Sequence, residues 1–244
     1  MIIRTQKDLN GVLLLNKPAG ITSHDLVYKV RKILQIKKVG HAGTLDPMAT
    51  GLMILLIGKA TKLSQYLMGM DKTYKGTIYL GKTTDTQDAE GKITQEREIP
   101  KIDVKAIQKA MDGFLGDQHQ IPPMFSAIKK HGQPLYKKAR KGEVVEREIR
   151  LIRVFNFYCQ SWLSPHIQFE INSTKGTYVR TLANDLGEKL GCGAHLSSLC
   201  RTMIERFSLE KAHSIEELQV ASESQVKEWL TSPHAITKNS LVSY

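Results

Sequence analysis

Residues 40–57 read Gly-His-Ala-Gly-Thr-Leu-Asp-Pro-Met-Ala-Thr-Gly-Leu-Met-Ile-Leu-Leu-Ile, a glycine-punctuated segment followed directly by an apolar run. Its three glycines permit backbone turns that other residues resist, and Pro47 disfavours helix for the residue before it. The segment therefore predicts a loop that carries one carboxylate, Asp46, ahead of a buried strand at 52–57. A lone aspartate in such a loop is ordinarily a turn or capping residue, so spacing alone assigns it no chemistry.

Outward from this loop, apolar periodicity predicts a mixed α+β chain. Helices are expected where Thr22 precedes Asp25, and again where serines at 214 and 222 precede Glu217 and Gln225, because these pairs have capping-box spacing. Further helices are expected at 59–68, after Asp103 and at 182–190. Strands are expected at 11–15, 52–57, 73–80, 149–158, 167–171 and 196–207. Residues 73–80 are expected to form a hairpin with the strand that contains Ile93, across a turn at 88–91.

Charge indicates the class of partner. The chain has 244 residues, 35 Lys+Arg and 24 Asp+Glu, which gives a formal net charge of +11 and a pI near 9.5. A basic balance of this size suits a polyanion, and nucleic acid is the leading candidate. Residues 129–150 hold eight Lys/Arg against three Glu. Such a segment is expected to be a surface lobe, although charge runs often need no partner beyond solvent.

Cysteine usage and hydropathy bound the compartment. Three cysteines with no Cys-x-x-Cys pair argue against a disulfide framework and favour the cytoplasm. The apolar run at 52–57 is too short to cross a bilayer, so no membrane association is expected. Cys192, His195 and Cys200 lack a fourth metal ligand, and neither a P-loop nor a dinucleotide loop occurs. Neither a metal nor a small-molecule cofactor is therefore expected.

Five motifs in order carry a resemblance to a known family. They are Gly11-Val-Leu-Leu-Leu-Asn-Lys-Pro-Ala-Gly20, the segment 40–51, Asp71-Lys-Thr-Tyr-Lys75, Lys175-Gly-Thr-Tyr-Val-Arg-Thr181 and Gly191-Cys-Gly-Ala-His195. This chain resembles the bacterial TruB family from about residue 11 to about 207. Those enzymes are tRNA pseudouridine synthases that act on uridine 55 of the TΨC loop.

The resemblance implies a fold and a domain plan. The fold would be that of the pseudouridine synthases: α+β, with a central mixed, mostly antiparallel sheet flanked by helices and loops. Residues 1–207 would form the catalytic domain, with an inserted basic thumb at about 119–150. Residues 208–244 would form a short helical tail, since 37 residues after Phe207 are too few for the complete RNA-binding PUA domain of many family members.

The resemblance also assigns a reaction and its catalytic residues. The bond from C1′ to N1 of uridine is broken, the uracil turns while bound, and C5 is joined to C1′. Asp46 matches the catalytic carboxylate, which needs no metal to attack or stabilise an electron-poor sugar carbon. Arg180 matches the arginine that pairs with this aspartate. Tyr74 matches the tyrosine that stacks on the target uracil and takes the C5 proton.

Other matched positions would bind the RNA. Tyr178 and Leu199 would line the uracil pocket, His41 would support the opened T-loop, and Lys17 would have a supporting role near the site. The thumb would contact the T stem-loop backbone through Lys137, Lys138, Arg140 and Lys141. Without the resemblance, His41 would be read as a plain loop histidine and Tyr74 as a cross-strand aromatic. Arg180 would be read as a structural or phosphate-binding arginine, and the basic segment as a solvated charged surface.

Two functional hypotheses remain at this stage. In the first, the chain is a monomeric tRNA isomerase. In the second, it is a tRNA-binding folding factor whose remodelling of the T-arm is independent of catalysis. A synthase for a different RNA uridine is a third reading, which the close motif match disfavours. Asp46, Tyr74 and Arg180 occurring together favour catalysis, because a pure binding protein would not require all three.

Overall fold

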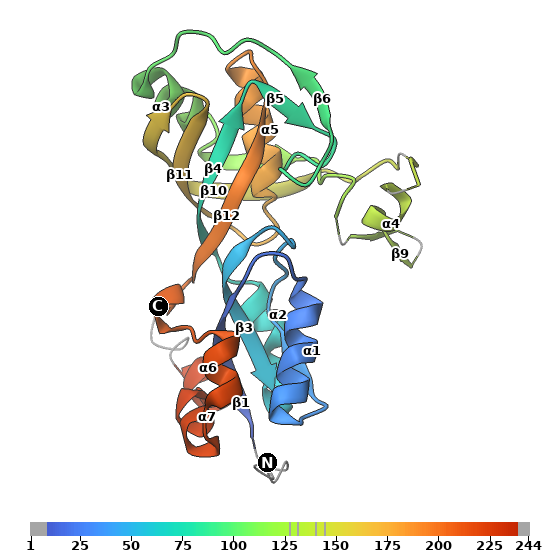
Figure 1. Cartoon of the computed structure of the whole chain (residues 1–244), viewed down its shortest axis with the longest axis vertical. Helices are drawn as coiled ribbons and strands as arrows, with labels where there is room; N and C mark the ends of the chain where they lie inside the picture. Colours follow the sequence, from blue (N-terminus) through green and yellow to red (C-terminus); the bar gives the residue numbers. More distant parts are fainter. Residues whose placement is uncertain (1–8, 127, 131, 140, 144, 239–244) are drawn as a thin grey trace. The chain divides into compact units, whose positions relative to one another are not determined.

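The computed structural model describes residues 9–126, 128–130, 132–139, 141–143 and 145–238 (Figure 1). The chain divides into two compact units. Unit 1 combines the described residues up to Lys72 with those from Cys200 onward, and unit 2 comprises residues 73–199. Unit 1 is thus built from both ends of the chain, whereas unit 2 is one continuous segment.

Unit 1 contains a mixed sheet in the order β1-β3-β12. Strands β1 and β3 are antiparallel, and the short pairing of β3 with β12 is parallel. Strand β2 pairs with β3, and β13 pairs with β12. The strands are β1 (Gly11–Lys17), β2 (Val39–His41), β3 (Thr50–Ile57), β12 (Ala194–Ile204), whose last residues lie in unit 1, and β13 (Phe207–Ser208). The helices are α1 (Ser23–Leu34), η1 (Gly58–Leu63), α2 (Ser64–Met68), η2 (Leu209–Lys211), α6 (Ile215–Val220), α7 (Glu223–Trp229) and α8 (Pro233–Lys238).

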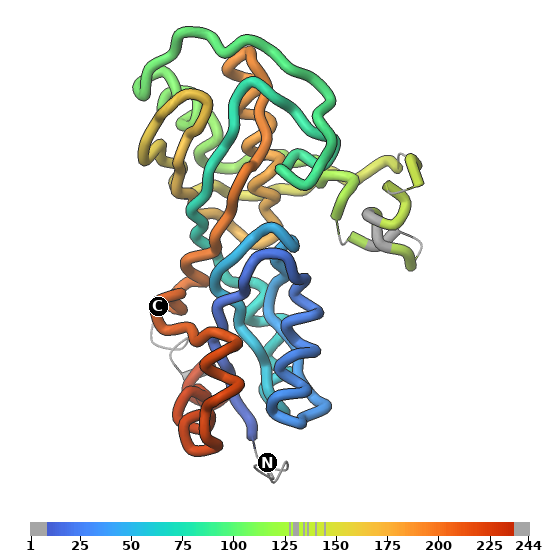
Figure 2. Tube along the Cα trace, in the orientation of Figure 1, coloured from blue at the N-terminus to red at the C-terminus, as the bar shows by residue number. Residues whose placement is uncertain are grey.

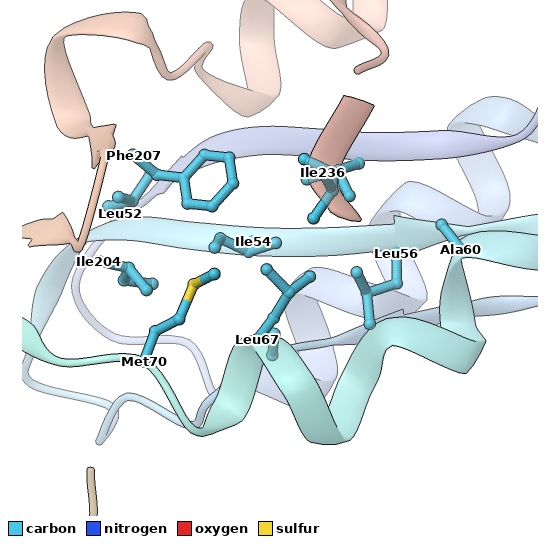
Figure 3. Packing of buried hydrophobic residues seen from close by; sticks show 11 residues of the cluster. Leu52, Ile54, Leu56, Ala60, Leu67, Met70, Ile204, Phe207 and Ile236 are labelled. Carbon is cyan, nitrogen blue, oxygen red and sulfur yellow. The ribbon is translucent and has the colours of Figure 1, made fainter. Parts of the chain in front are cut away.

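The core of unit 1 forms around β3, which is buried along almost its whole length. Leu52, Ile54 and Leu56 point to one side of this strand, where they meet side chains from α2 and from the C-terminal part of the chain (Figure 3). Ile236 of α8 is 1% exposed and belongs to the same cluster. Residues more than 180 positions apart therefore share one apolar core, which rigidly supports the segment that precedes β3.

The C-terminal segment also covers the free edge of β1. The backbones of Val12 and Thr231 exchange two hydrogen bonds of 2.8 and 3.0 Å, and those of Leu14 and Asn16 bond to His213 at 3.0 and 2.8 Å. In Figure 2 the C-terminal part of the tube accordingly runs beside the N-terminal strand. Because the edge strand has its N–H and C=O groups paired here, it does not offer them to another chain.

Unit 2 is built on the sheet order β12-β4-β11-β10-β7. The pairs β10–β11 and β7–β10 are antiparallel, like β1–β3, whereas β3–β12 is parallel. The strand pairing is therefore mixed but mostly antiparallel, as predicted. The strands are β4 (Lys72–Leu80), β5 (Lys82–Thr84), β6 (Ile93–Glu96), β7 (Gly116–Gln120), β8 (Lys129–Lys130), β9 (Gln133–Pro134), β10 (Arg150–Leu163) and β11 (His166–Ser173), together with the first residues of β12. The helices are α3 (Val104–Asp112), α4 (Leu135–Ala139) and α5 (Val179–Lys189).

Local signals in the sequence predicted the starts of four helices correctly, but not those of α4 and α8. Capping boxes form at Thr22, Ser214 and Ser222, and Asp103 caps α3. The helix expected at 59–68 begins as 3-10 helix and becomes α-helical only at Ser64. No helix in the described part of the chain is both long and apolar enough to cross a membrane.

One strand pairing was predicted wrongly. The strand that contains Ile93 is β6, and it pairs with β5, not with 73–80. Strand β4 is instead an inner strand of the large sheet, between β12 and β11. The turn signal at 88–91 was sound, but a hairpin signal does not specify how far the strands on either side extend. Gly40 also departs from expectation, because it lies within β2 and has no positive φ.

Candidate active site

Asp46 lies in a loop of unit 1 between β2 and β3, as the sequence predicted. We call residues 42–49 the Asp46 loop. Its five consecutive backbone carbonyls at 43–47 all accept hydrogen bonds from the protein. The donors are the Arg201 guanidinium for Gly43 and Thr44, the Ser23 hydroxyl for Leu45, the Ala49 N–H for Asp46 and the Gly20 N–H for Pro47. With the carbonyls of residues 43–47 engaged, the peptides around Asp46 have little freedom to rotate, so its side chain starts from a fixed backbone.

The first residue of α1 holds this loop from one side. The Ser23 hydroxyl, at the first residue of α1, accepts from the Leu45 N–H at 2.8 Å and donates to the Leu45 carbonyl at 3.1 Å. Leu45 itself is buried, whereas Asp46 is half-buried. The residue before the carboxylate is therefore anchored in the core, and the carboxylate lies at the boundary with solvent.

Lys17, at the end of β1, is completely buried. Its ammonium donates to the carbonyl oxygens of Pro18, Ile21 and Pro47 at 2.9, 2.8 and 3.2 Å. A buried charge is tolerated only where polar groups replace its water, and these carbonyls do so. The bond to Pro47 ties the turn after β1 to the Asp46 loop, so Lys17 lies beneath the loop as part of its support.

His41 ends β2, directly before the Asp46 loop, and is half-buried. Burial lowers the pKa of His41, and the nearby charge of Arg201 and the imidazole of His24 lower it further, against a hydrogen bond to the Gly43 backbone that raises it. The net direction is downward from 6.5, so the imidazole is neutral at neutral pH. A neutral ring can both donate and accept hydrogen bonds.

Arg180 lies in unit 2 on the first turn of α5, where it is 6% exposed. Its Nη1 donates to Asp88 Oδ2 at 3.1 Å, and its Nη2 donates to the Phe125 carbonyl at 2.9 Å. The other oxygen of Asp88 accepts from the Thr86 hydroxyl at 2.6 Å and from the Glu90 N–H at 3.1 Å. Asp88 is 2% exposed. This pair fixes the guanidinium within the unit through a carboxylate that is itself fixed.

Sequence reasoning missed Asp88, which it assigned only to a turn. The turn exists, because the Asp88 carbonyl accepts from the Gly91 N–H at 3.3 Å and the Asp88 carboxylate accepts from the Glu90 N–H at 3.1 Å. The partner across the ion pair, however, is 92 positions away in the sequence. No local pattern in the sequence indicates such a contact. The only hint was that Thr84 and Thr86 closely precede this aspartate, in a stretch whose sequence otherwise looks exposed.

Tyr178 is the N-cap residue of α5. Gln120, buried at the end of β7, holds its backbone with two bonds: Nε2 donates to the Tyr178 carbonyl at 3.0 Å, and Oε1 accepts from the Tyr178 N–H at 2.8 Å. The Arg180 guanidinium carbon lies 6.0 Å from the centroid of the Tyr178 ring, at the outer limit for a cation–π contact. Tyr178 and Arg180, two positions apart in the sequence, therefore also lie near each other in space.

Tyr74 and Leu199 lie on the neighbouring strands β4 and β12 of unit 2. Each is 9% exposed. The strands are joined nearby by the Ser197 hydroxyl, which donates to the Thr77 carbonyl at 3.0 Å. An aromatic ring and an aliphatic side chain, both nearly buried, therefore lie on adjacent strands, and their role in lining a uracil pocket stays a prediction.

The basic segment between β7 and β10 forms a separate small hairpin, β8–β9, followed by α4 (Figure 1). Lys137 and Lys141 are exposed and Lys138 is half-buried, while Arg140 lies outside the described residues. The base of this lobe is fastened where Arg147 donates to the Pro122 carbonyl at 3.2 Å.

His195, considered above as a metal ligand, instead bonds through Nδ1 to the Lys82 carbonyl and stacks on Tyr79.

The predicted site residues thus fall into two groups. Lys17, His41 and Asp46 belong to unit 1, and Tyr74, Tyr178, Arg180 and Leu199 belong to unit 2. Within unit 1 the Asp46 loop joins all three, and within unit 2 the start of α5 and the β4–β12 pair carry the rest. The pairing of Asp46 with Arg180 stays a prediction.

Comparison with known proteins identifies the family. Residues 31–179, more than half of the chain, match the TruB family pseudouridylate synthase N-terminal domain, and residues 180–233 match the tRNA pseudouridylate synthase B C-terminal domain. The chain is 55% identical over 218 residues to tRNA pseudouridine synthase B of Opitutus terrae, covering 89% of this chain and 90% of that protein. The corresponding protein of Pasteurella multocida is 45% identical over 219 residues, which are 90% of this chain and 71% of that protein.

A solved structure shares the fold. A chain of a Cbf5–Nop10–Gar1 complex superposes with a TM-score of 0.71 at 27% identity, over 91% of this chain. This chain spans only 60% of the length of that one. Since the TruB N-terminal model alone matches more than half of the chain and the relatives are 45 to 55% identical to it, the chain belongs to the TruB family of pseudouridylate synthases.

Proposed function

We propose that this chain converts uridine 55 in the T stem-loop of tRNA to pseudouridine, acting as a monomer. The observation that carries the proposal is the Asp46 loop: a half-buried carboxylate on a backbone whose neighbouring carbonyls are all bonded, in a chain of the TruB family. Curated relatives named tRNA pseudouridine synthase B, at 45 to 55% identity, support the assignment of tRNA as substrate.

In the proposed reaction the C1′–N1 bond of the uridine breaks and the C1′–C5 bond forms. N1 gains a proton, C5 loses one, and no atom is added or lost overall. Asp46 is assigned to the sugar, where its negative charge can attack or stabilise the electron-poor carbon. Arg180 is assigned to keep that carboxylate ionised and oriented. Tyr74 is assigned to stack on the uracil and to remove the C5 proton.

The other residues are assigned to the RNA. A uridine in a folded T-loop is stacked, so it must be extruded before it can react, at a cost of a few kcal/mol. Tyr178 and Leu199 would complete the base pocket, and the neutral His41 would support the opened loop. Lys137, Lys138, Arg140 and Lys141 would bind the phosphate backbone, while the buried Lys17 would act only through the loop it supports.

The test is Asp46→Asn on a T-arm transcript labelled with tritium at C5 of uridine, because the label is released only when pseudouridine forms. We expect the rate to fall by at least a factor of about 10³, as for removal of a nucleophile in other enzymes. Asp117→Asn removes an exposed carboxylate from β7 and should leave the rate unchanged. A transcript with cytidine at position 55 should release no label.

The outcomes also separate catalysis from binding. Undiminished release by the Asp46→Asn variant would show that the mechanism is wrong. Retained binding and refolding of the T-arm without release would show that the chain also acts as an RNA-folding factor, independently of turnover.

A further inference from the structure

Arg201 is the largest fully buried side chain among the described residues, with 1% exposure, and the proposed reaction gives it no role. It lies on β12 within unit 1. Its guanidinium donates through Nε to the Leu52 carbonyl at 2.8 Å and through Nη2 to the Gly43 carbonyl at 3.2 Å. A longer bond of 3.5 Å joins Nη1 to the Thr44 carbonyl.

These bonds lie on both sides of Asp46 in the sequence. Gly43 and Thr44 enter the Asp46 loop, and Leu52 follows it in β3. One planar group therefore joins the beginning of the loop to the strand that carries its end. Gly43 has a φ of +109°, and a Cβ at this position would lie 3.6 Å from Arg201 Nη1, so the loop backbone passes directly against the guanidinium.

The backbone of Arg201 fixes the other end of the loop. Arg201 is in register with Gly51 in the short parallel pairing of β12 with β3. Gly51 has a φ of +103°, and a Cβ there would lie 2.4 Å from the Arg201 carbonyl oxygen. Only glycine fits a contact this close. The side chain of Arg201 thus holds the loop where it begins, and its main chain holds the loop where it ends.

We propose that Arg201 is a positioning residue for the isomerisation, which sets the place of the Asp46 carboxylate by bracketing the Asp46 loop. This inference rests on the proposed function. Arginine suits the task because its rigid planar fork reaches several carbonyls at once, whereas the lysine ammonium is a single point. A loop displaced by about 1 Å can lose on the order of a hundredfold in rate, since attack requires close alignment.

The experiment compares Arg201→Lys and Arg201→Met with Arg206→Met. Arg206 donates to the Ile236 carbonyl at 2.7 Å in the same unit, so the control removes a guanidinium–carbonyl bond that does not touch the loop. Single-turnover release of tritium is measured at saturating T-arm, together with the Kd for the T-arm and the Tm. We expect Arg201→Lys to be roughly tenfold slower and Arg201→Met roughly a hundredfold slower, with Kd within about threefold of wild type.

The Lys variant serves if the Met variant does not fold, and hydrogen exchange gives a readout independent of turnover. In Arg201→Lys, amides at 42–49 should exchange faster while those of β1 keep their wild-type rates; in Arg206→Met, the loop should be unaffected. The inference would be overturned if Arg201→Lys released tritium at the wild-type rate, or if its loss of release rate were no larger than that of Arg206→Met at equal Tm. If wild type itself released no tritium, the proposed function would fail, while unchanged exchange at 42–49 would separately show that Arg201 does not hold the loop.

Discussion

The buried cationic side chains of unit 1 donate hydrogen bonds to the backbone. Lys17, Lys72 and Arg201 are each at most 5% exposed, and each donates to main-chain carbonyls. Lys72 donates to the carbonyls of Met68, the last residue of α2, and of Met70, and its Cε lies 3.9 Å from where a Cβ of Gly43 would stand. Dehydrating a cation costs several kcal/mol unless polar groups replace the lost water, so each cation selects the backbone arrangement that supplies its carbonyls.

At His41 the same surroundings give a pH-dependent stability. The folded pKa lies below 6.5, mainly because of burial and secondly because of Arg201. Below about pH 6.5 the unfolded chain therefore binds a proton that the folded chain resists, and stability falls as the pH falls. We expect the difference in free energy of unfolding between wild type and His41→Gln to shrink from pH 7.5 to 5.5, as measured by urea denaturation at each pH. A difference that stays constant over this range would contradict the assignment.

Single residues also mark where sequence reasoning stops. Asp46 could be placed in its loop from glycine and proline alone, and its proposed chemistry came only from the family resemblance. Lys17 was recognised as a motif residue, yet its complete burial depends on carbonyls up to 30 positions away. Asp88 was predicted only as a turn residue, and Arg201 was not singled out. The hydrogen-bond partners that define their roles lie more than 90 positions away in the sequence.

Among the elements, those specified locally were the most predictable. The starts of α1, α6 and α7 follow from capping boxes, because a cap involves residues only three positions apart. Strand partners are not local: β4 lies between β11 and β12, which come about 90 and 120 residues later. The hairpin assigned to β4 was wrong for that reason. Alternating hydrophobicity identifies a strand, but several strands of similar length can compete as its partner.

The lobe formed by β8, β9 and α4 carries a prediction of its own. We expect Lys137→Glu, Lys138→Glu and Lys141→Glu in combination to weaken T-arm binding and to reduce the slope of log K against log salt by roughly two to three, if each lysine neutralises one phosphate. Filter binding between 50 and 200 mM salt measures both quantities.

The matched control for this lobe lies elsewhere in unit 2. Lys101, Lys105 and Lys109 are exposed residues at or before α3, and their reversal changes the net charge by the same amount. Equal losses in the two triple variants would show that general charge, and not this lobe, governs binding.

At the scale of the whole molecule, the C-terminal helices are part of the unit 1 core. Ile236 belongs to the same buried cluster as Ile54 and Leu67, so Ile236→Ala should cost about 2–5 kcal/mol of unfolding free energy, the usual range for removing a buried aliphatic side chain. Val220→Ala, at a side chain 86% exposed on α6, should change it by less than about 0.5 kcal/mol. Chemical denaturation gives both values, and similar small losses would mean that α8 does not stabilise the unit.

The pairing of Thr231 with Val12 has a consequence for how the protein is made. Unit 2 is continuous, so all of its residues leave the ribosome while unit 1 still lacks everything from Cys200 onward. Because domains generally fold as they emerge, unit 2 can acquire its structure during synthesis, but unit 1 must wait for the residues from Cys200 onward. Until then β1 has an open edge, and the Asp46 loop lacks the Arg201 beneath it. The unit that carries the proposed nucleophile is therefore the last to mature, and until its residues from Cys200 onward are made the Asp46 loop lacks its support.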